Sequence, residues 1–275
     1  MNRDDVGRIV RVEEVMGTRA SVHVVVSDDA PAILSLEVDD AIDRALATLH
    51  DADRRFSTYR EDSEIRRIAR GELRLTDAHA DVREVEAECR EALALTGGRF
   101  SAWWRGWFDP TGYVKGWAVD CAVQEHLAEL LDLDGVLAVG LDVGGDLRVH
   151  TTPGADWAWR VGVADPQVRG AVLATLELTD GAVATSGPAE RGTHIVDPSS
   201  GKPAVGVVSA TVVSDSLAHA DLWATTAVIA GIDDLQWVRD AGTRSGLVVA
   251  ADGRTRRWAG ASEVSLVDAS GAAAF

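Results

Sequence analysis

Hydrophobic and polar residues follow two spacings along this chain, and each spacing predicts one kind of secondary structure. Alternation over 20–26 predicts a strand with one buried face. Apolar residues at helical spacing predict a helix over 36–49 that ends before Asp53. The same spacing predicts three further helices, over 81–95, 115–131 and 217–230. The chain therefore combines helices and strands.

Short runs rich in β-forming residues lie between the third and fourth predicted helices, separated by Gly, Asp and Pro. They predict strands of one antiparallel or mixed sheet. The runs are 136–141, 159–164, 172–178 and 207–213, with later strands expected over 247–250 and around Arg257. We see no repeat and no linker. The pattern predicts an α+β fold over 1–275, a single large domain of two packed α/β lobes, with 269–275 as a frayed tail.

The charge of the chain excludes some ligands. A formal charge of -17 and a pI near 4.7 argue against nucleic acid and anionic membrane surfaces, which require basic patches. An anionic ligand would need local help from a cation, a helix N-terminus or a bound metal. The chain of 275 residues with 46% hydrophobic content is long enough to bury a large core.

The cysteines and the N-terminus bear on cellular location. Cys89 and Cys121 fall inside helical patterns without CxxC spacing, which predicts buried reduced thiols. The first residues are charged throughout and lack the apolar core of a signal peptide. No stretch approaches the ~20 apolar residues that a membrane span needs. We therefore expect a cytoplasmic protein.

The segment 180–203 carries the strongest indication of chemistry. It places a Thr-Ser pair and a histidine among glycines, as in a pocket that brings backbone close to a phosphate and positions a base. Taken alone, His194 is more often a hydrogen-bonded core histidine than a catalytic one. Asp197 either orients His194 or holds the turn at Pro198.

A second candidate lies where the third helix begins. Residues 109–112 form a turn, and Lys115 follows close to the helix start, where a lysine opposes the helix dipole unless an anion is near. Just upstream, Trp103, Trp104 and Trp107 either fill an interface between lobes or face a ligand.

A third candidate is the pair Asp221 and Thr225, four residues apart on one helical face. Such a pair is usually solvated. Here the neighbouring positions are apolar, so an unpaired Asp221 would be costly to bury, and a hard cation removes that cost. Carboxylate, hydroxyl and carbonyl oxygens suit Mg²⁺, which also bridges phosphate oxygens.

Three shorter motifs have both a structural and a functional interpretation. Met16 opens a Gly turn before a strand and could simply be a core methionine. Tyr59 follows a helix in the pattern Phe-Ser-x-Tyr, where aromatic residues usually belong to the core. The run 144–146, Gly-Gly-Asp, is a tight turn, and we interpret Asp146 as structural rather than catalytic.

These motifs, taken in order from residue 15 to 231, resemble the ApbE family of flavin transferases. The resemblance implies an ApbE-like, T-fold-like structure with the FAD site between the lobes. It also implies Mg²⁺-dependent transfer of FMN from FAD to a Thr or Ser hydroxyl of an acceptor protein, with release of AMP. Most family members have a far longer insertion between Phe100 and Asp109.

The resemblance assigns roles to individual residues. It implies that His194 deprotonates the acceptor hydroxyl. Cofactor contacts fall to Met16, Tyr59, Arg99, Phe100, Ser101, Lys115, Cys121 and Ile195, and the metal to Asp221, Thr225 and the main-chain carbonyls of Ala118 and Ala224.

Two alternatives remain open at this point. The same residues could use water in place of a protein hydroxyl, which would make the protein an FAD pyrophosphatase releasing FMN and AMP. A flavin-binding protein without turnover is the other alternative, although His194 and Asp221 argue against it. The expected partners are FAD and an acceptor protein, with no nucleic acid and no membrane.

Overall fold

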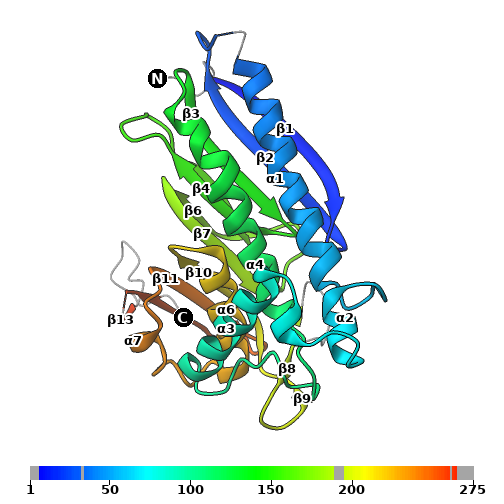
Figure 1. The fold of residues 1–275 in the computed structure, drawn as a ribbon. Helices are drawn as coiled ribbons and strands as arrows, with labels where there is room; N and C mark the ends of the chain where they lie inside the picture. The colour runs from blue at the N-terminus through cyan, green and yellow to red at the C-terminus, as the bar shows by residue number, and fades with distance from the viewer. Residues whose placement is uncertain (1–5, 32–33, 189–194, 261, 265–275) are drawn as a thin grey trace, which may run out of the picture.

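The computed structural model describes residues 6–31, 34–188, 195–260 and 262–264. Its centre is a nine-stranded sheet in the order β1-β2-β3-β4-β7-β10-β11-β12-β13, antiparallel at every pairing (Figure 1). The α+β prediction is confirmed, and the sheet runs unbroken through both predicted halves. Its strands are β1 (Val6–Val15), β2 (Thr18–Ser27), β3 (Val136–Val143), β4 (Asp146–Thr151), β7 (Asp180–Ser186), β10 (Val207–Ser214), β11 (Ser245–Ala250), β12 (Thr255–Ala259) and β13 (Ser262–Val264).

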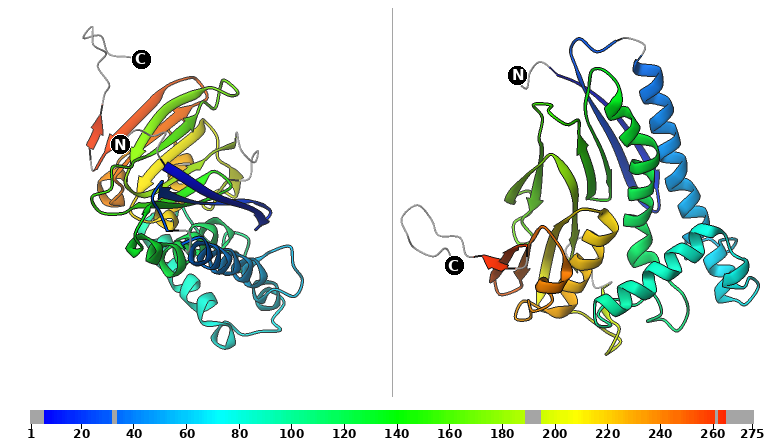
Figure 2. Two further views of the ribbon diagram at one scale, coloured as in Figure 1. Left: turned by 90° about the horizontal axis from the view of Figure 1, so that it is seen from above. Right: turned by 60° about the vertical axis from the view of Figure 1, so that its left-hand side comes forward.

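The principal helices form a layer on one side of this sheet, as the view from above in Figure 2 shows. Their apolar faces and the sheet enclose the main hydrophobic core. Smaller helical segments connect these elements. The helices are α1 (Leu34–Phe56), α2 (Glu64–Ala69), η1 (Leu75–Asp77), α3 (Ala80–Leu95), α4 (Thr111–Ala122), η2 (Val123–Leu127), η3 (Ala128–Asp132), α6 (Leu217–Ala230) and α7 (Val238–Ala241). Within the described residues no helix has the length and apolar character needed to cross a membrane.

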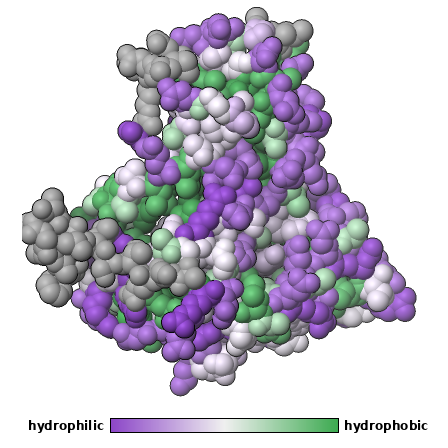
Figure 3. All heavy atoms as spheres, turned by 90° about the vertical axis from the view of Figure 1, so that its left-hand side faces the viewer, coloured by the Kyte–Doolittle hydropathy of each residue, from purple (hydrophilic) through white to green (hydrophobic). Residues whose placement is uncertain are grey.

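The strands β5 (Trp159–Ala164) and β6 (Val172–Leu178) correct the prediction of one sheet. Among the described strands they pair only with each other, and they pack on the large sheet, where Val163 lies in a cluster with Leu247 and Val249. Their boundaries match the predicted ones, but a pattern of alternating residues does not say which strands are partners. Figure 3 shows the face of the molecule that lies on the left-hand side of Figure 1, and hydrophobic and hydrophilic residues are mixed across this face.

Each of the four predicted helices is present near its predicted position, and the structure adds shorter ones such as α2 and α7. The helix predicted over 217–230 is α6, and α3 starts one residue before the predicted 81–95. The helix α1 extends beyond the predicted 36–49 at both ends. The prediction over 115–131 corresponds to α4 followed by a π turn, η2, and a 3-10 turn, η3. The helix α4 begins four residues before the predicted start, so 111–112, which we expected in a turn, are helical.

The strand β1 was not predicted, because it is an edge strand whose polar residues outnumber the buried ones. It joins β2 through a two-residue turn formed by Met16 and Gly17, with Val15 paired to Thr18. Both turn residues have positive φ, +54° for Met16 and +72° for Gly17, as a type I′ hairpin turn requires. Met16 is strained in this conformation, which is more common at functional sites than elsewhere.

The helices α4 and α6 are in close contact at Gly116. A Cβ atom placed on Gly116 would lie 2.6 Å from the Cα of Ala218 and 2.7 Å from its backbone nitrogen. One turn further along α4, the two carboxylate oxygens of Asp120 accept hydrogen bonds from the backbone N–H groups of Leu217 and Ala218, at 2.9 and 2.8 Å. A carboxylate of α4 therefore caps the N-terminus of α6.

A partly buried histidine also belongs to the start of α6. The Nε2 atom of His219 accepts a hydrogen bond from the indole Nε1 of Trp223 at 2.9 Å, and its Nδ1 lies 2.7 Å from the hydroxyl of Ser214. An indole N–H can only donate, so His219 must be neutral with its proton on Nδ1. Burial lowers the pKa of His219 below the usual 6.5, in the direction that this arrangement requires.

Replacing Gly116 with Ala should reduce the free energy of unfolding by about 1–3 kcal/mol, because the new methyl group meets backbone that cannot rotate away. Urea unfolding measures this. Gly112→Ala in the same helix is the matched control, since its Cβ would meet only the edge of the Phe100 ring, at 3.3 Å. A Gly116→Ala variant as stable as the control would contradict the close contact.

Stability should also fall as the pH drops below about 6.5. The unfolded chain protonates its histidine there, whereas folded His219 resists protonation, so stability present above that pH is lost towards the lower folded pKa. Urea unfolding at several pH values should show a weaker dependence in His219→Gln. The pH dependence of stability should not vanish in the variant, because burial also lowers the pKa of His23 and His150. Equal slopes in wild type and variant would refute this account of His219.

Candidate active site

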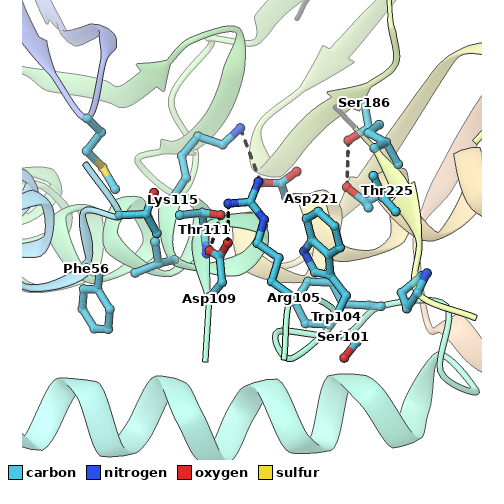
Figure 4. Close-up of a pocket in the computed structure, with 18 of the residues that line it drawn as sticks. Phe56, Ser101, Trp104, Arg105, Asp109, Thr111, Lys115, Ser186, Asp221 and Thr225 are labelled. Carbon is cyan, nitrogen blue, oxygen red and sulfur yellow. Dashed lines mark hydrogen bonds and ion pairs between the residues drawn. The ribbon is translucent and has the colours of Figure 1, made fainter. Parts of the chain in front are cut away.

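A cavity of about 790 Å³ opens beside the ends of α4 and α6 (Figure 4). Its walls are the β1–β2 turn, the end of α1 with the loop after it, the loop before α4, the end of β7 and part of α6. The chain around the small hairpin of β8 (Val196–Asp197) and β9 (Lys202–Pro203) closes another side. Elements distant in the sequence thus meet at one volume that is large enough for a dinucleotide.

Most of the residues that sequence motifs singled out line this cavity. They are Met16, Tyr59, Arg99, Phe100, Ser101, Lys115, Ile195, Asp221 and Thr225. The alanines expected to offer carbonyl oxygens, Ala118 and Ala224, are fully buried inside their helices and do not line it. His194 lies outside the described residues.

Cys121 is set apart from this group, because it lies on α4 but does not line the cavity. Its thiol is free, and burial together with nearby carboxylates such as Glu125 and Glu84 raises its pKa to about 12. Cys89 is also free and is buried as expected, whereas Cys121 is only partly buried.

An ion-paired cluster lies at the floor of the cavity, which Lys115 and Asp221 line while Asp146 is buried behind them. Lys115 of α4 forms an ion pair and hydrogen bond with Asp146, and its Nζ lies 3.4 Å from the carboxylate of Asp221. Asp146 follows a two-residue turn at the start of β4 and also accepts a hydrogen bond of 2.9 Å from the backbone N–H of Thr185. Asp146 is 2% exposed and its carboxylate accepts both of these hydrogen bonds, so its role is to position Lys115 and the end of β7.

The floor is anionic, because the single ammonium of Lys115 faces the carboxylates of both Asp146 and Asp221. Asp142 lies nearby, and burial raises the pKa of its carboxyl above the usual value, although the backbone N–H of Gly145 and the charge of Lys115 oppose this. An excess of buried negative charge is stable only with a further cation or with proton uptake. An anionic ligand bound here would need that cation as well.

The side chains of Asp221 and Thr225 lie one turn apart on α6 and both reach the cavity. The hydroxyl of Thr225 is 3.1 Å from that of Ser186 at the end of β7. Asp221 is 7% exposed, and its charge partner Lys115 is beyond ordinary hydrogen-bond distance. The donor set is made of oxygen atoms, which fits a hard divalent cation such as Mg²⁺.

Sequence reasoning treated Asp109 only as part of a turn, but it is a buried member of the cavity wall. Its Oδ1 accepts hydrogen bonds from the backbone N–H and the hydroxyl of Thr111, at 3.2 and 2.7 Å, at the start of α4. Its Oδ2 lies 3.4 Å from Arg105. An Asp two residues before a Thr, ahead of a predicted helix, is a capping pattern that could have indicated this.

The opposite wall carries aromatic and apolar side chains. Tyr59 is 93% exposed at the rim, which is unusual for a large aromatic residue, whereas Phe56 below it is buried. Trp104 and Phe100 line the side formed by the loop before α4. Arg99, next to Phe100, donates a hydrogen bond of 2.6 Å to the carboxylate of Asp234.

The structure favours one of the two interpretations of Asp197. Its carboxylate accepts hydrogen bonds of 2.8–2.9 Å from the hydroxyls of Ser199 and Ser200 and from the backbone N–H of Ser199. These bonds hold the pKa of Asp197 below its usual value. Asp197 therefore holds the turn after Pro198, while Ile195 and Pro198 beside it reach the cavity.

Sequence comparison places this arrangement among known proteins. The ApbE family model matches residues 16–105 and 104–247. An FAD:protein FMN transferase of Rhodobacter capsulatus is 35% identical over 156 residues, which are 53% of this chain and 28% of that protein. One of Escherichia coli K12 is 29% identical over 145 residues, which are 49% of this chain and 39% of that protein. The chain thus spans well under half the length of these relatives.

Solved structures share the fold. The crystal structure of the ApbE protein of Thermotoga maritima superimposes with a TM-score of 0.75 at 23% identity, covering 91% of this chain and 97% of that one. The apo form of a flavinyl transferase ApbE from Pseudomonas stutzeri superimposes with a TM-score of 0.71 at 21% identity, covering 93% of this chain and 95% of that one. Since the family match spans most of the chain and includes both halves of the cavity, the protein belongs to the ApbE family.

Proposed function

We propose that this protein transfers FMN from FAD to a Thr or Ser hydroxyl of an acceptor protein and releases AMP. The observation that carries the proposal is the anionic floor of Lys115, Asp146 and Asp221 beneath a dinucleotide-sized cavity. The relatives' name, FAD:protein FMN transferase, supports the same reaction.

The two sides of the cavity suit the two halves of FAD. We infer that Met16, Tyr59 and Ile195 contact the flavin ring, because they line the cavity and offer flat or apolar surface. Arg99, Phe100 and Ser101 line another wall and would face the adenosine half. Lys115 lies in the second turn of α4, close to the positive end of the helix dipole, where its ammonium would meet phosphate oxygens.

A bound Mg²⁺ would neutralise the diphosphate and the leaving AMP. We propose that Asp221 and Thr225 hold it, together with the carbonyl oxygens of Ala118 and Ala224. The charge of the floor supports this proposal, because two carboxylates face one ammonium there. Without a further cation, a diphosphate would be repelled.

The chemical step is a displacement at phosphorus. The acceptor hydroxyl oxygen bonds to the FMN phosphorus, and the P–O bond to the bridging oxygen breaks so that AMP leaves with that oxygen. We infer that His194 accepts the hydroxyl proton, an inference that rests on the motif Thr-Ser-Gly, His-Ile, Asp-Pro alone. The buried wall around Ile195 would limit competition by water.

Incubation with FAD, Mg²⁺ and candidate acceptor proteins tests the proposal. Covalent flavin fluorescence on the acceptor in a denaturing gel, with one AMP per flavin, is the expected result. Free FMN and AMP without labelled acceptor would favour hydrolysis, and tight FAD binding without AMP would favour a binding protein. Either outcome would replace the proposed reaction.

Asp221→Asn should abolish the effect of Mg²⁺ on FAD affinity, because the variant keeps the shape of the side chain but loses its charge. Transfer should fall by about 100-fold or more, since metal stabilisation is worth several kcal/mol. FAD titration by fluorescence, with and without Mg²⁺, gives a readout independent of turnover. Asp252→Asn removes an exposed carboxylate outside the cavity and should behave as wild type. A normal Mg²⁺ response in Asp221→Asn would dismiss the metal assignment.

His194→Asn should leave FAD bound, because the proposed flavin contacts remain, while transfer falls by about 10²–10⁴-fold as for loss of a general base. Transfer rates under saturating FAD measure this. His50→Asn, at an exposed histidine paired with Glu13, is the control and should keep the wild-type rate. A wild-type rate in His194→Asn would require another base.

A further inference from the structure

The positive side chains that line the cavity differ in how fully they are engaged. Among the described residues these are Arg99, Arg105 and Lys115. Arg99 donates a hydrogen bond of 2.6 Å to Asp234, and Lys115 is shared between two carboxylates. Their charge is therefore largely balanced by the protein itself.

Arg105 is different. Its nearest charge partner is Asp109, at 3.4 Å, and within the described part of the chain its guanidinium forms no hydrogen bond. Its side chain is 48% exposed. The N–H donors of its planar guanidinium that do not face Asp109 remain available for a ligand.

The guanidinium is nevertheless held in place. Its Cζ lies 4.7 Å from the centre of the Trp104 ring, a cation–π contact. Asp109 is itself fixed by its two hydrogen bonds to Thr111, so its remaining oxygen stays directed at Arg105. A guanidinium positioned in advance loses little freedom when it binds an anion.

The position of Arg105 indicates which part of a ligand it would meet. In Figure 4, Phe56 lies at one end of the cavity and Trp104 with Ser101 towards the other, with the guanidinium between them, directed to where Lys115 and Asp221 lie. The proposed flavin contact Tyr59 belongs to the loop that begins at Phe56. Arg105 therefore approaches the diphosphate position from the side away from the flavin.

We propose that Arg105, held by Trp104 and Asp109, binds the AMP-side phosphate of FAD and thereby distinguishes the dinucleotide from FMN. The proposal rests on the proposed function, and it adds a specificity residue that none of the sequence motifs included. Arg105 would also bind the phosphate of the AMP product.

The test is calorimetric titration of wild type and Arg105→Gln with FAD, AMP and FMN in the presence of Mg²⁺. Loss of a charge-assisted contact should weaken FAD and AMP binding by about tenfold or more and leave FMN unchanged. Arg105→Lys keeps the charge but not the planar donors, so its FAD affinity should lie between those of wild type and Arg105→Gln. Arg74→Gln removes an exposed arginine that does not line the cavity and is the matched control.

Unchanged FAD affinity in Arg105→Gln would overturn the proposal. So would an equal loss for FMN and FAD, because Arg105 would then contact the flavin half. If wild type binds AMP but not FAD, the proposed function fails, while the AMP titration still decides the role of Arg105. Unfolding curves of the variants exclude loss of the fold as the cause.

Discussion

The contact between α4 and α6 at Gly116 determines where the polar groups of the cavity lie. Lys115 precedes this glycine on α4, and Asp221 follows the contact by one turn on α6. Asp120 fixes the same junction by capping α6. Because both helices are locked at backbone distance, the ammonium and the carboxylate face each other without depending on flexible packing.

This arrangement gives the site an unbalanced negative charge. Asp146 and Asp221 share one ammonium in a region with little solvent, and Asp142 adds a partly buried carboxyl. Such a cluster does not contribute much to stability, because desolvation offsets the attraction. Its side chains leave an excess of negative charge, because two carboxylates face one ammonium.

The fold was predictable in its elements and less so in its connections. The helix α6 and the strands β5 and β6 were placed correctly from local sequence, because a long apolar run favours a buried helix and short β-forming runs between turn residues favour strands. The edge strand β1 was missed, since half of its residues face solvent. The separation of β5 and β6 from the large sheet also escaped prediction, because pairing depends on residues far away in the sequence.

The sequence by itself determined which main residues belong to the site, since Met16, Lys115, Asp221 and Thr225 stand in recognisable motifs and all line the cavity. Only the tertiary structure decided how they act together. It showed that Lys115 is shared by two carboxylates, that Asp197 holds a turn, and that Arg105 enters the cavity with donors to spare. The physical reason is that charge balance and hydrogen-bond satisfaction are properties of distances between segments, and local sequence does not contain those distances.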